Sequence, residues 1–340
     1  MKQFLSLGEL PREEVVDLLA LAAHLERTGD PQALAGKILG LLFFNPSLRT
    51  LASMQAAMAK LGGASFVVQP GTSSWKLESR SGVVMDGEAS EHVREAIPVL
   101  AGYADVLGVR AFASGSDLAA DLADTSFREI AALSPKPLVN LESAIDHPCQ
   151  ALADWKTLDD LGVARHGKLV LSWANHPKAL PLAVPAAVLR MAALRGMAVT
   201  VLAPAAYALP EPLLAEARGL AASAGGSVVA TDDRAAALDG AAILYAKSWS
   251  SAAHYGDAAK ERELRAGLAS WCVEESWFER APGARFMHCL PVRRNVVVAD
   301  AVLDSPRSVV VQQAHNRLWA QMAVLHRLLA GPHSTAAQSG

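Results

Sequence analysis

The chain has few cysteines and no run of apolar residues long enough to cross a membrane. Its 340 residues include only Cys149, Cys272 and Cys289, and this spacing indicates neither a disulfide framework nor a zinc knuckle. No apolar segment approaches the about 18 residues that a transmembrane helix needs, and the first residues contain no basic stretch followed by an apolar run. We therefore expect reduced thiols and a cytoplasmic protein.

Strong charge of either sign is also absent. Charged residues make up 19% of the chain, hydrophobic residues 51%, and the formal net charge is -3. This composition is typical of folded globular proteins, and it lacks the positive charge typical of nucleic-acid-binding domains. We expect small-molecule ligands, with no nucleic acid, no membrane, no metal and no cofactor.

Strand-like and helix-like segments alternate along the whole chain. Helical spacing is found at residues 9–25 and 91–103, between apolar runs that are typical of buried parallel strands. The expected strands span residues 37–44, 64–69, 104–112, 137–140, 168–174, 198–204, 227–232, 241–249, 284–291 and 308–314. This alternation predicts an α/β protein, with two doubly wound parallel-sheet domains of similar size joined by helices.

The length agrees with two domains, since 340 residues exceed the usual size of one hydrophobic core. We expect a first domain over residues 1–150 and a second over residues 151–315. A C-terminal helix over residues 316–332 is expected to pack back on the first domain. Residues 333–340 are small and polar and are expected to form a flexible tail.

The segment FFNPSLRT, residues 43–50, joins the end of an expected strand to the start of a helix. Free backbone N–H groups and the helix dipole favour an anion at a helix N-terminus. Arg49 and the hydroxyls of Ser47 and Thr50 add donors that suit phosphate oxygens. The alternative is that Ser47 only caps the helix and Arg49 is a solvated surface residue.

Similar anion-binding residues recur at three other points, and they favour the phosphate-binding interpretation. They are Arg110 in GVRAF, His147 and Gln150 in HPCQ, and Arg317 in HNRL. With these residues the sequence resembles the aspartate and ornithine carbamoyltransferase family, whose members carry S-x-R-T, H-P-x-Q and H-C-L-P motifs in this order. Here the motifs occupy residues 47–50, 147–150 and 288–291, and the resemblance extends from the first helix to about Leu329.

The resemblance implies that the first domain binds carbamoyl phosphate and the second an acyl-ornithine. The implied carbamoyl phosphate site consists of Ser47, Leu48, Arg49, Thr50, Trp75, Arg110, His147, Gln150, Cys289, Leu290 and Arg317. Thr50, Arg110 and His147 are the implied catalytic residues, because negative charge develops on the carbamoyl oxygen when an amine attacks. The chain departs from the common S-T-R-T-R pattern at Leu48 and Leu51, so a second arginine is missing there.

Trp75 concerns the number of subunits that form the active site. In acyl-ornithine members of the family, an equivalent tryptophan reaches the phosphate from a neighbouring subunit. The resemblance therefore implies a homotrimer with active sites shared between subunits. The alternative is that Trp75 is a core residue, since large aromatic side chains usually pack inside.

The resemblance also addresses the amine that accepts the carbamoyl group. Ordinary ornithine enzymes bind the free α-amino and α-carboxylate groups with an Asp and an S-M-G segment. Neither appears in the corresponding region of this chain. Its segments AILYAKSW, WANHPK and HCLPVRRN resemble the branch that acts on N-acetylornithine or N-succinylornithine. An acylated substrate has no α-ammonium group, so its pocket needs no carboxylate to pair with one.

The expected acyl-ornithine site consists of Ser90, Glu142, His176, Lys247, Leu290 and Arg293. Lys247 and Arg293 are expected to bind carboxylate or acyl oxygens, with His176 as a further donor. The alternatives are a surface cation at a strand end for Lys247 or Arg293, and a turn cap for His176. Glu142 is expected to position the reacting amine. The proton acceptor stays open between Glu142, desolvation of the amine and the departing phosphate.

Ser90 and Val297 favour a succinyl acceptor. Acetyl-specific relatives carry Glu and Lys at these positions. A glutamate would repel the distal carboxylate of a succinyl group, whereas serine leaves room and adds no like charge. We therefore expect N-succinyl-L-ornithine to be converted to N-succinyl-L-citrulline and phosphate in arginine biosynthesis. Succinyl-specific enzymes tend to have Pro at position 90, so N-acetyl-L-ornithine remains the alternative acceptor.

Three other functions fit the sequence less well. A Cys-His nucleophile at Cys149 or Cys289 would need further signs of a triad, which the sequence does not give. A nicotinamide dehydrogenase would need a glycine-rich turn after a strand, and WANHPKALP offers none. A non-catalytic relative that binds carbamoyl phosphate is suggested by the missing arginine at position 51, but the other motif residues are all retained.

Overall fold

The computed structural model describes residues 1–330, which form two compact units. The first unit contains residues 1–113, 122–149 and 317–330, and the second contains residues 114–121 and 150–316. Each unit is built on one parallel sheet, which confirms the predicted α/β class with two doubly wound domains. Residues 114–121 depart from the expected division, since they belong to the second unit. The expected tail, residues 333–340, lies outside the described residues.

The sheet of the first unit has the strand order β2-β1-β5-β6, and all neighbouring strands are parallel. Its strands are β1 (Ile38–Phe43), β2 (Ala64–Val68), β5 (Val106–Arg110) and β6 (Leu138–Glu142). The chain adds β2 on one side of β1 and then returns to add β5 and β6 on the other. In open parallel sheets, ligands bind beyond the carboxyl ends of the strands where this order reverses.

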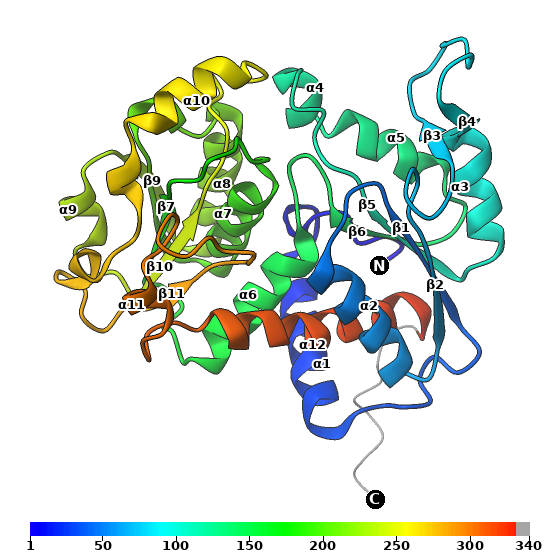
Figure 1. Ribbon diagram of the computed structural model, residues 1–340. Helices are drawn as coiled ribbons and strands as arrows, with labels where there is room; N and C mark the ends of the chain where they lie inside the picture. The colour runs from blue at the N-terminus through cyan, green and yellow to red at the C-terminus, as the bar shows by residue number, and fades with distance from the viewer. Residues whose placement is uncertain (331–340) are drawn as a thin grey trace, which may run out of the picture. The chain divides into compact units, whose positions relative to one another are not determined.

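Helices cover both faces of this sheet (Figure 1). They are the 3-10 turn Leu7–Glu9, α1 (Arg12–Thr28), α2 (Leu48–Lys60), α3 (Val93–Gly102) and α5 (Thr125–Leu133). Ile97 of α3 and Phe127 of α5 pack with Leu107 and Val109 of β5 in one apolar cluster. The short helix α4 (Leu118–Leu122) lies at the boundary of the two units along the chain.

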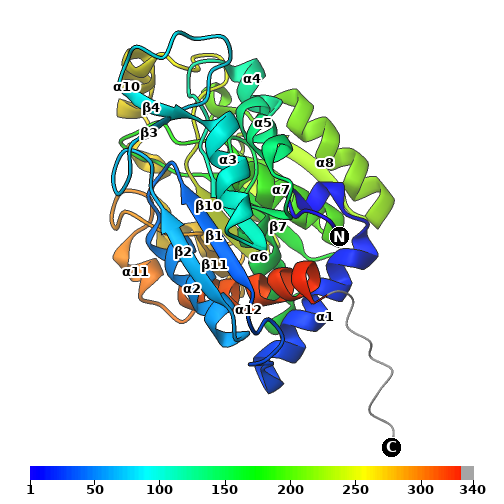
Figure 2. The ribbon, with the colours of Figure 1, turned by 90° about the vertical axis from the view of Figure 1, so that its right-hand side faces the viewer.

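A small second sheet in the first unit was not predicted. It pairs β3 (Lys76–Glu78) with β4 (Ala89–His92) in parallel. Both strands are short and polar, so they lack the apolar run by which the larger strands were found. The two strands lie beside α3, apart from the four-stranded sheet (Figure 2).

The sheet of the second unit has the strand order β11-β10-β7-β8-β9, again all parallel. Its strands are β7 (Lys168–Trp173), β8 (Ala198–Leu202), β9 (Ser227–Thr231), β10 (Ile243–Lys247) and β11 (Arg285–Met287). The order reverses between β7 and β10, so the carboxyl ends of these two strands are where a ligand is expected.

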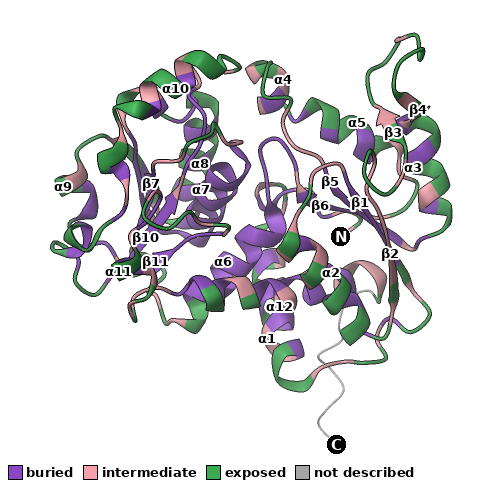
Figure 3. Cartoon of the chain, viewed as in Figure 1, coloured by how far each residue is buried: buried purple, intermediate pink, exposed green. Residues whose placement is uncertain are grey.

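The helices that follow in the chain are α6 (Pro148–Asp160), α7 (Ala183–Arg195), α8 (Glu211–Ala224), α9 (Arg234–Leu238), α10 (Ala258–Ala266) and α11 (Asp300–Leu303), with 3-10 turns Ala205–Tyr207, Ala269–Trp271 and Glu275–Phe278. Helix α7 is buried along its whole length (Figure 3). This explains its mostly apolar sequence, because it has no face left for water, and its two arginines, Arg190 and Arg195, are paired with Glu216 and Asp159. Within residues 1–330, no helix is both long and apolar enough to cross a membrane.

The strand expected over residues 308–314 is wrong. Helix α12 runs from Val310 to Leu329, and not from Asn316. Its run of valines suggested a strand because β-branched residues favour sheets. In the structure Val310 and Gln313 are buried while Val311 is 62% exposed, which follows the helical period. From Arg317 onward α12 belongs to the first unit, as expected for a C-terminal helix that packs back on that domain.

Gly108 in β5 leaves space that a side chain would fill. A Cβ atom there would lie 2.9 Å from Leu141 Cδ1 and 3.0 Å from Leu41 Cδ2, and both leucines are buried. We expect Gly108→Ala to lower the free energy of unfolding by about 1–3 kcal/mol through overpacking. In the control Gly219→Ala, no atom lies within 4 Å of the new Cβ in α8, and helix propensity should raise stability by about 0.5–1 kcal/mol. Urea denaturation measures both, and changes of the same sign would contradict the prediction.

Candidate active site

Three strand ends of the first unit lie next to one another. Phe43 of β1 is paired with Arg110 of β5, and Arg110 with Glu142 of β6. The loops beyond the strands are also joined, since the backbone N–H of Phe112 donates to Asn45 Oδ1 at 2.8 Å. The structure therefore places the FFNPSLRT loop, Arg110 and Glu142 at one edge of the sheet, where its strand order reverses.

The N-terminus of α2 is held by its own side chains. Ser47 is the N-cap, and its Oγ accepts from the backbone N–H of Thr50 at 3.2 Å. The capping alternative is thus correct for Ser47. It does not exclude an anion, because a cap uses only one of the N–H groups that are free at a helix start. Thr50 is fully buried, and its Oγ1 accepts from Arg317 Nη2 at 2.7 Å.

Arg317 is a buried cation with further cations around it. Arg317 is only 2% exposed. The pKa of Arg317 is lowered to about 10, mainly by burial and also by Arg49 and Arg110, while Cys149 and Glu142 act in the opposite direction. The guanidinium is therefore charged at neutral pH.

Buried donors in this cluster can accommodate an anion. The charged groups that act on Arg317 include two further guanidinium groups, those of Arg49 and Arg110, and the carboxylate of Glu142. The buried Nε atoms of Arg110 and Arg317 have no hydrogen-bond partner among residues 1–330. Unsatisfied buried donors are costly, and a phosphate group supplies the acceptors that they lack.

Glu142 lies between two of the expected catalytic residues. It forms an ion pair with Arg110, and its Oε2 is 3.6 Å from His147 Nε2. Arg110 is further fixed because its guanidinium lies over the ring of Phe112, 4.4 Å from the centroid. Both Arg110 and His147 are buried, so their side chains are held in place before any ligand binds.

Cys149 does not have the properties of a nucleophile. Its side chain is fully buried, and Sγ lies 3.8 Å from the carbonyl oxygen of Asn140. Burial raises the pKa of the Cys149 thiol to about 12, although Arg317 counteracts the rise. Since the thiolate is the reactive form, the Cys-His alternative fails at this residue.

The second unit gathers cations beyond β7 and β10. Lys247 is the last residue of β10 and is paired with Trp173, the last residue of β7. His176 follows β7, and Arg293 Nε donates to its Nε2 at 3.2 Å. A guanidinium can only donate, so this ring nitrogen carries no proton. His176 therefore holds Arg293, whereas the sequence suggested that it donates to a ligand.

The charge of His176 follows from the same surroundings. Its pKa is lowered to about 4, mainly by burial and also by Arg293, Lys247 and Arg265, while a hydrogen bond with Lys178 acts in the opposite direction. The ring is thus neutral at pH 7, and its Nδ1 lies 3.0 Å from both the backbone nitrogen and the carbonyl oxygen of Lys178, so the alternative that His176 caps this turn also holds.

Three residues expected at the carbamoyl phosphate site belong to the second unit. Gln150 Nε2 donates to Asp154 Oδ1 at 2.8 Å. Cys289 is buried beyond β11, and Leu290 has a φ of 55°, which is uncommon for a branched residue. Such outliers cluster at functional sites, but the part of these residues in phosphate binding stays a prediction.

Trp75 and Ser90 lie on the small sheet of the first unit. Trp75, directly before β3, is 59% exposed, and its Nε1 donates to Glu91 Oε2 at 2.9 Å. The alternative that Trp75 is a core residue is therefore wrong. Ser90 is exposed on β4, so a group at this position is open to a ligand.

Family models match both halves of the chain. The carbamoyl-P binding domain of the aspartate/ornithine carbamoyltransferases matches residues 2–160. Their Asp/Orn binding domain matches residues 184–328. The chain belongs to the aspartate/ornithine carbamoyltransferase family. It is an enzyme of that family, a carbamoyltransferase.

Similar proteins cover nearly the whole carbamoyltransferase chain. The N-acetylornithine carbamoyltransferase of Xanthomonas campestris is 39% identical over 333 residues, with 97% of this chain and 98% of the relative covered. The N-succinylornithine carbamoyltransferase of Bacteroides thetaiotaomicron is 36% identical over 300 residues, with 87% and 88% covered. A crystal structure of acetylornithine transcarbamylase complexed with acetylcitrulline superposes with a TM-score of 0.93 at 38% identity, covering 97% of this chain and 99% of that one.

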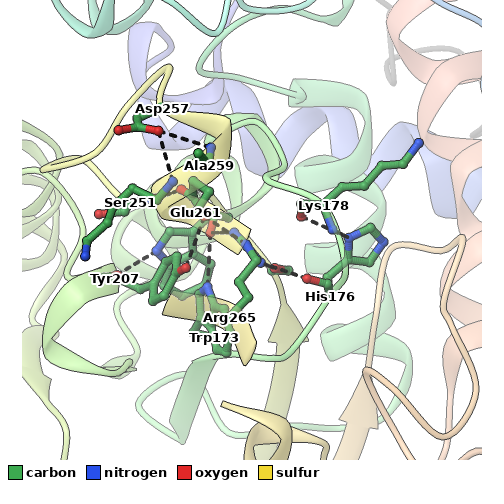
Figure 4. A network of polar contacts seen from close by, with 12 residues as sticks. Trp173, His176, Lys178, Tyr207, Ser251, Asp257, Ala259, Glu261 and Arg265 are labelled. Atoms are coloured by element: carbon green, nitrogen blue, oxygen red, sulfur yellow. Dashed lines mark hydrogen bonds and ion pairs between the residues drawn. The ribbon is translucent and has the colours of Figure 1, made fainter. Parts of the chain in front are cut away.

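The sequence did not point to several polar residues that orient the site. Arg265 of α10 donates to the carbonyl oxygen of His176 at 3.2 Å and to Ser248 Oγ at 2.9 Å (Figure 4). Its partner Glu261 is four residues earlier. This spacing is the only signal in the sequence, and it is shared by ordinary ion pairs on exposed helices.

Arg317 is expected to contribute directly to carbamoyl phosphate binding. In Arg317→Met, the affinity for carbamoyl phosphate should fall about 10- to 100-fold, since a charged hydrogen bond is worth about 1.5–3 kcal/mol. Stability should not fall with it, because an apolar chain replaces a buried cation. Calorimetric titration and thermal unfolding measure the two effects. Arg128→Met, which removes a surface ion pair with Glu9 at 2.5 Å, is the control, and equal affinity in both variants would contradict the prediction.

Proposed function

We propose that this carbamoyltransferase moves the carbamoyl group of carbamoyl phosphate to the side-chain amine of N-succinyl-L-ornithine. The products are N-succinyl-L-citrulline and phosphate, in arginine biosynthesis in the cytoplasm. The observation that carries the transfer is the pair of buried arginines Arg110 and Arg317 at the edge where α2 begins, whose Nε atoms have no hydrogen-bond partner among residues 1–330.

The phosphate group of the donor substrate binds at the start of α2. Its oxygens accept from the free backbone N–H groups of the helix and from the hydroxyl of Ser47. Arg49 and Arg317 provide positive charge for the same group. Negative charge grows on this group as the bond to the carbamoyl carbon breaks, so these donors stabilise the departing phosphate.

The carbamoyl oxygen receives negative charge when the amine attacks. Thr50, Arg110 and His147 donate to it. Thr50 is suited to this role because its Oγ1 already accepts from Arg317, which leaves the hydroxyl hydrogen for another acceptor. Arg110 is held against Glu142 and Phe112, so little reorganisation is needed.

The acceptor substrate binds through its carboxylates to Lys247 and Arg293 in the second unit. The charged groups that act on His176 are all cations, namely Arg293, Lys247 and Arg265. Arg265 is paired with Glu261, whereas Lys247 and Arg293 form no ion pair with a carboxylate among residues 1–330, which suits a substrate that has no α-ammonium group. In this role His176 acts through Arg293, to which it is hydrogen-bonded. Glu142 positions the reacting amine and Leu290 contacts the acceptor.

Ser90 supports a succinyl group over an acetyl group. A solved acetylornithine transcarbamylase in which a glutamate is replaced by serine is complexed with carbamyl phosphate and N-succinyl-L-norvaline, and it superposes with a TM-score of 0.93. The resemblance puts Ser90 where acetyl-specific relatives carry a glutamate. N-acetyl-L-ornithine is the second candidate, because the relative of Xanthomonas campestris with 39% identity is named for it.

The proposal includes a homotrimer in which subunits share active sites. Its support is Trp75, which is large, aromatic and 59% exposed, a combination that is enriched at interfaces. Light scattering of the purified protein tests the assembly. A monomer at the concentrations used for activity would refute this part of the proposal.

An acceptor panel tests the proposed function. Purified protein is assayed for ureido product with carbamoyl phosphate and ornithine, N-acetylornithine or N-succinylornithine. The largest kcat/KM is expected with N-succinylornithine. Product from free ornithine alone would overturn the acceptor assignment. Binding of carbamoyl phosphate without product from any acceptor would instead support a non-catalytic relative.

Ser90→Glu should separate the two acylated acceptors. We expect kcat/KM for N-succinylornithine to fall at least about tenfold, equivalent to about 1.4 kcal/mol, because the new carboxylate repels the distal carboxylate of the substrate. The value for N-acetylornithine should change much less. Ser223→Glu, on the exposed surface of α8, controls for added charge. An equal loss with both acceptors would remove Ser90 from the acyl pocket.

A further inference from the structure

A buried ion pair lies beneath the acceptor-binding residues of the second unit. Arg265 and Glu261 of α10 are only 5% and 3% exposed, and Arg265 Nε donates to Glu261 Oε2 at 2.8 Å. The pair sits in a network of polar contacts (Figure 4). A buried ion pair is weak support for stability, since hydrophobic residues of similar volume often stabilise a fold as well or better. Stability alone therefore does not explain the pair Arg265–Glu261, and the groups that Arg265 contacts indicate which loops the pair orients.

The guanidinium of Arg265 is hydrogen-bonded to both loops that follow β7 and β10, the two strands between which the strand order reverses. It donates to the carbonyl oxygen of His176 at 3.2 Å, in the loop after β7. It also donates to Ser248 Oγ at 2.9 Å and to the carbonyl oxygen of Trp249 at 2.8 Å, directly after Lys247 at the end of β10. Both loops carry residues to which the acceptor is assigned.

Glu261 fixes the orientation of this guanidinium. Its Oε2 also accepts from the Tyr207 hydroxyl at 3.0 Å, and its Oε1 accepts from the backbone N–H of Ser251 at 2.5 Å. The guanidinium lies 5.4 Å from the ring of Trp173 and 4.9 Å from that of Tyr207. A lysine has no planar fork and cannot repeat these contacts.

We propose that Arg265 is a positioning residue for the acceptor substrate, which holds the His176 loop and the segment after Lys247 in their binding arrangement. Its effect reaches Arg293 through His176, whose Nε2 accepts from Arg293 Nε. This inference rests on the proposed function. Without the planar guanidinium of Arg265 the two loops can move apart. Lys247 and Arg293 then no longer lie where the carboxylates of an acylornithine bind.

Arg195 provides a matched control in the same unit. It is also 5% exposed, pairs with Asp159 at 3.0 Å, and donates to the carbonyl oxygens of Val163 and Ala164. Its contacts lie before β7, at the amino end of that strand. Arg195 thus has the burial and hydrogen bonding of Arg265 without a contact to the acceptor-binding loops.

The test compares Arg265→Lys with Arg195→Lys in steady-state kinetics and thermal unfolding. In Arg265→Lys, KM for the acylated acceptor should rise at least about tenfold, as expected when charged hydrogen bonds of about 1.5–3 kcal/mol are lost. KM for carbamoyl phosphate should stay unchanged. Arg195→Lys should lower the unfolding temperature comparably without changing the acceptor KM. Equal acceptor KM values in the two variants would overturn the proposal.

A second measurement does not depend on activity. The midpoint of His176 in an NMR titration should rise in Arg265→Met, because a nearby positive charge is removed, and should not move in Arg195→Met. An unchanged His176 midpoint in Arg265→Met would contradict the proposal. If neither Arg265 variant folds, Glu261→Gln keeps the shape of the pair, and the same rise in acceptor KM is expected. Absence of product in the unmodified enzyme would refute the proposed function itself, whereas the NMR result would still test Arg265.

Discussion

The burial of a charged arginine is the constraint on which the phosphate-binding edge depends. Arg317 is desolvated, yet it remains charged at neutral pH, and it acts on Thr50 through a hydrogen bond of 2.7 Å. The buried Nε atoms of Arg110 and Arg317 have no hydrogen-bond partner in the described part of the chain. An anion would supply acceptors for them, and a ligand that binds only the folded state also stabilises it. The same residues thus make the empty protein costly to fold and the anion favourable to bind.

The second unit also contains a buried cation, Arg265, which is paired with the carboxylate of Glu261. Four of its five N–H donors have acceptors, from Glu261 and three neighbouring groups. These contacts fix the guanidinium, which fits the proposed positioning role. Lys247 and Arg293 are less buried and keep their charge near His176, which remains neutral. In both units a buried cation orders the carboxyl ends of the strands, and more accessible cations are left for the substrate.

Much of the fold followed from the sequence because buried parallel strands are apolar throughout. The strands from β1 to β11 were found except β3 and β4, which are short and polar. The valines at 309–311 were misjudged since their β-propensity outweighed the helical period in the sequence, whereas burial along α12 decided the outcome. Local propensity is a weak guide wherever packing against other elements sets the conformation.

The sequence by itself determined the family, and it predicted a phosphate loop at Ser47 to Thr50, because short motifs carry both signals directly. Tertiary structure decided which charges are buried and which are accessible. It showed that Ser47 also caps α2, that His176 accepts from Arg293, and that the pair Glu261–Arg265 is interior. Burial and electrostatic coupling act through space between residues far apart in the chain, so no pattern of neighbours in the sequence reveals them.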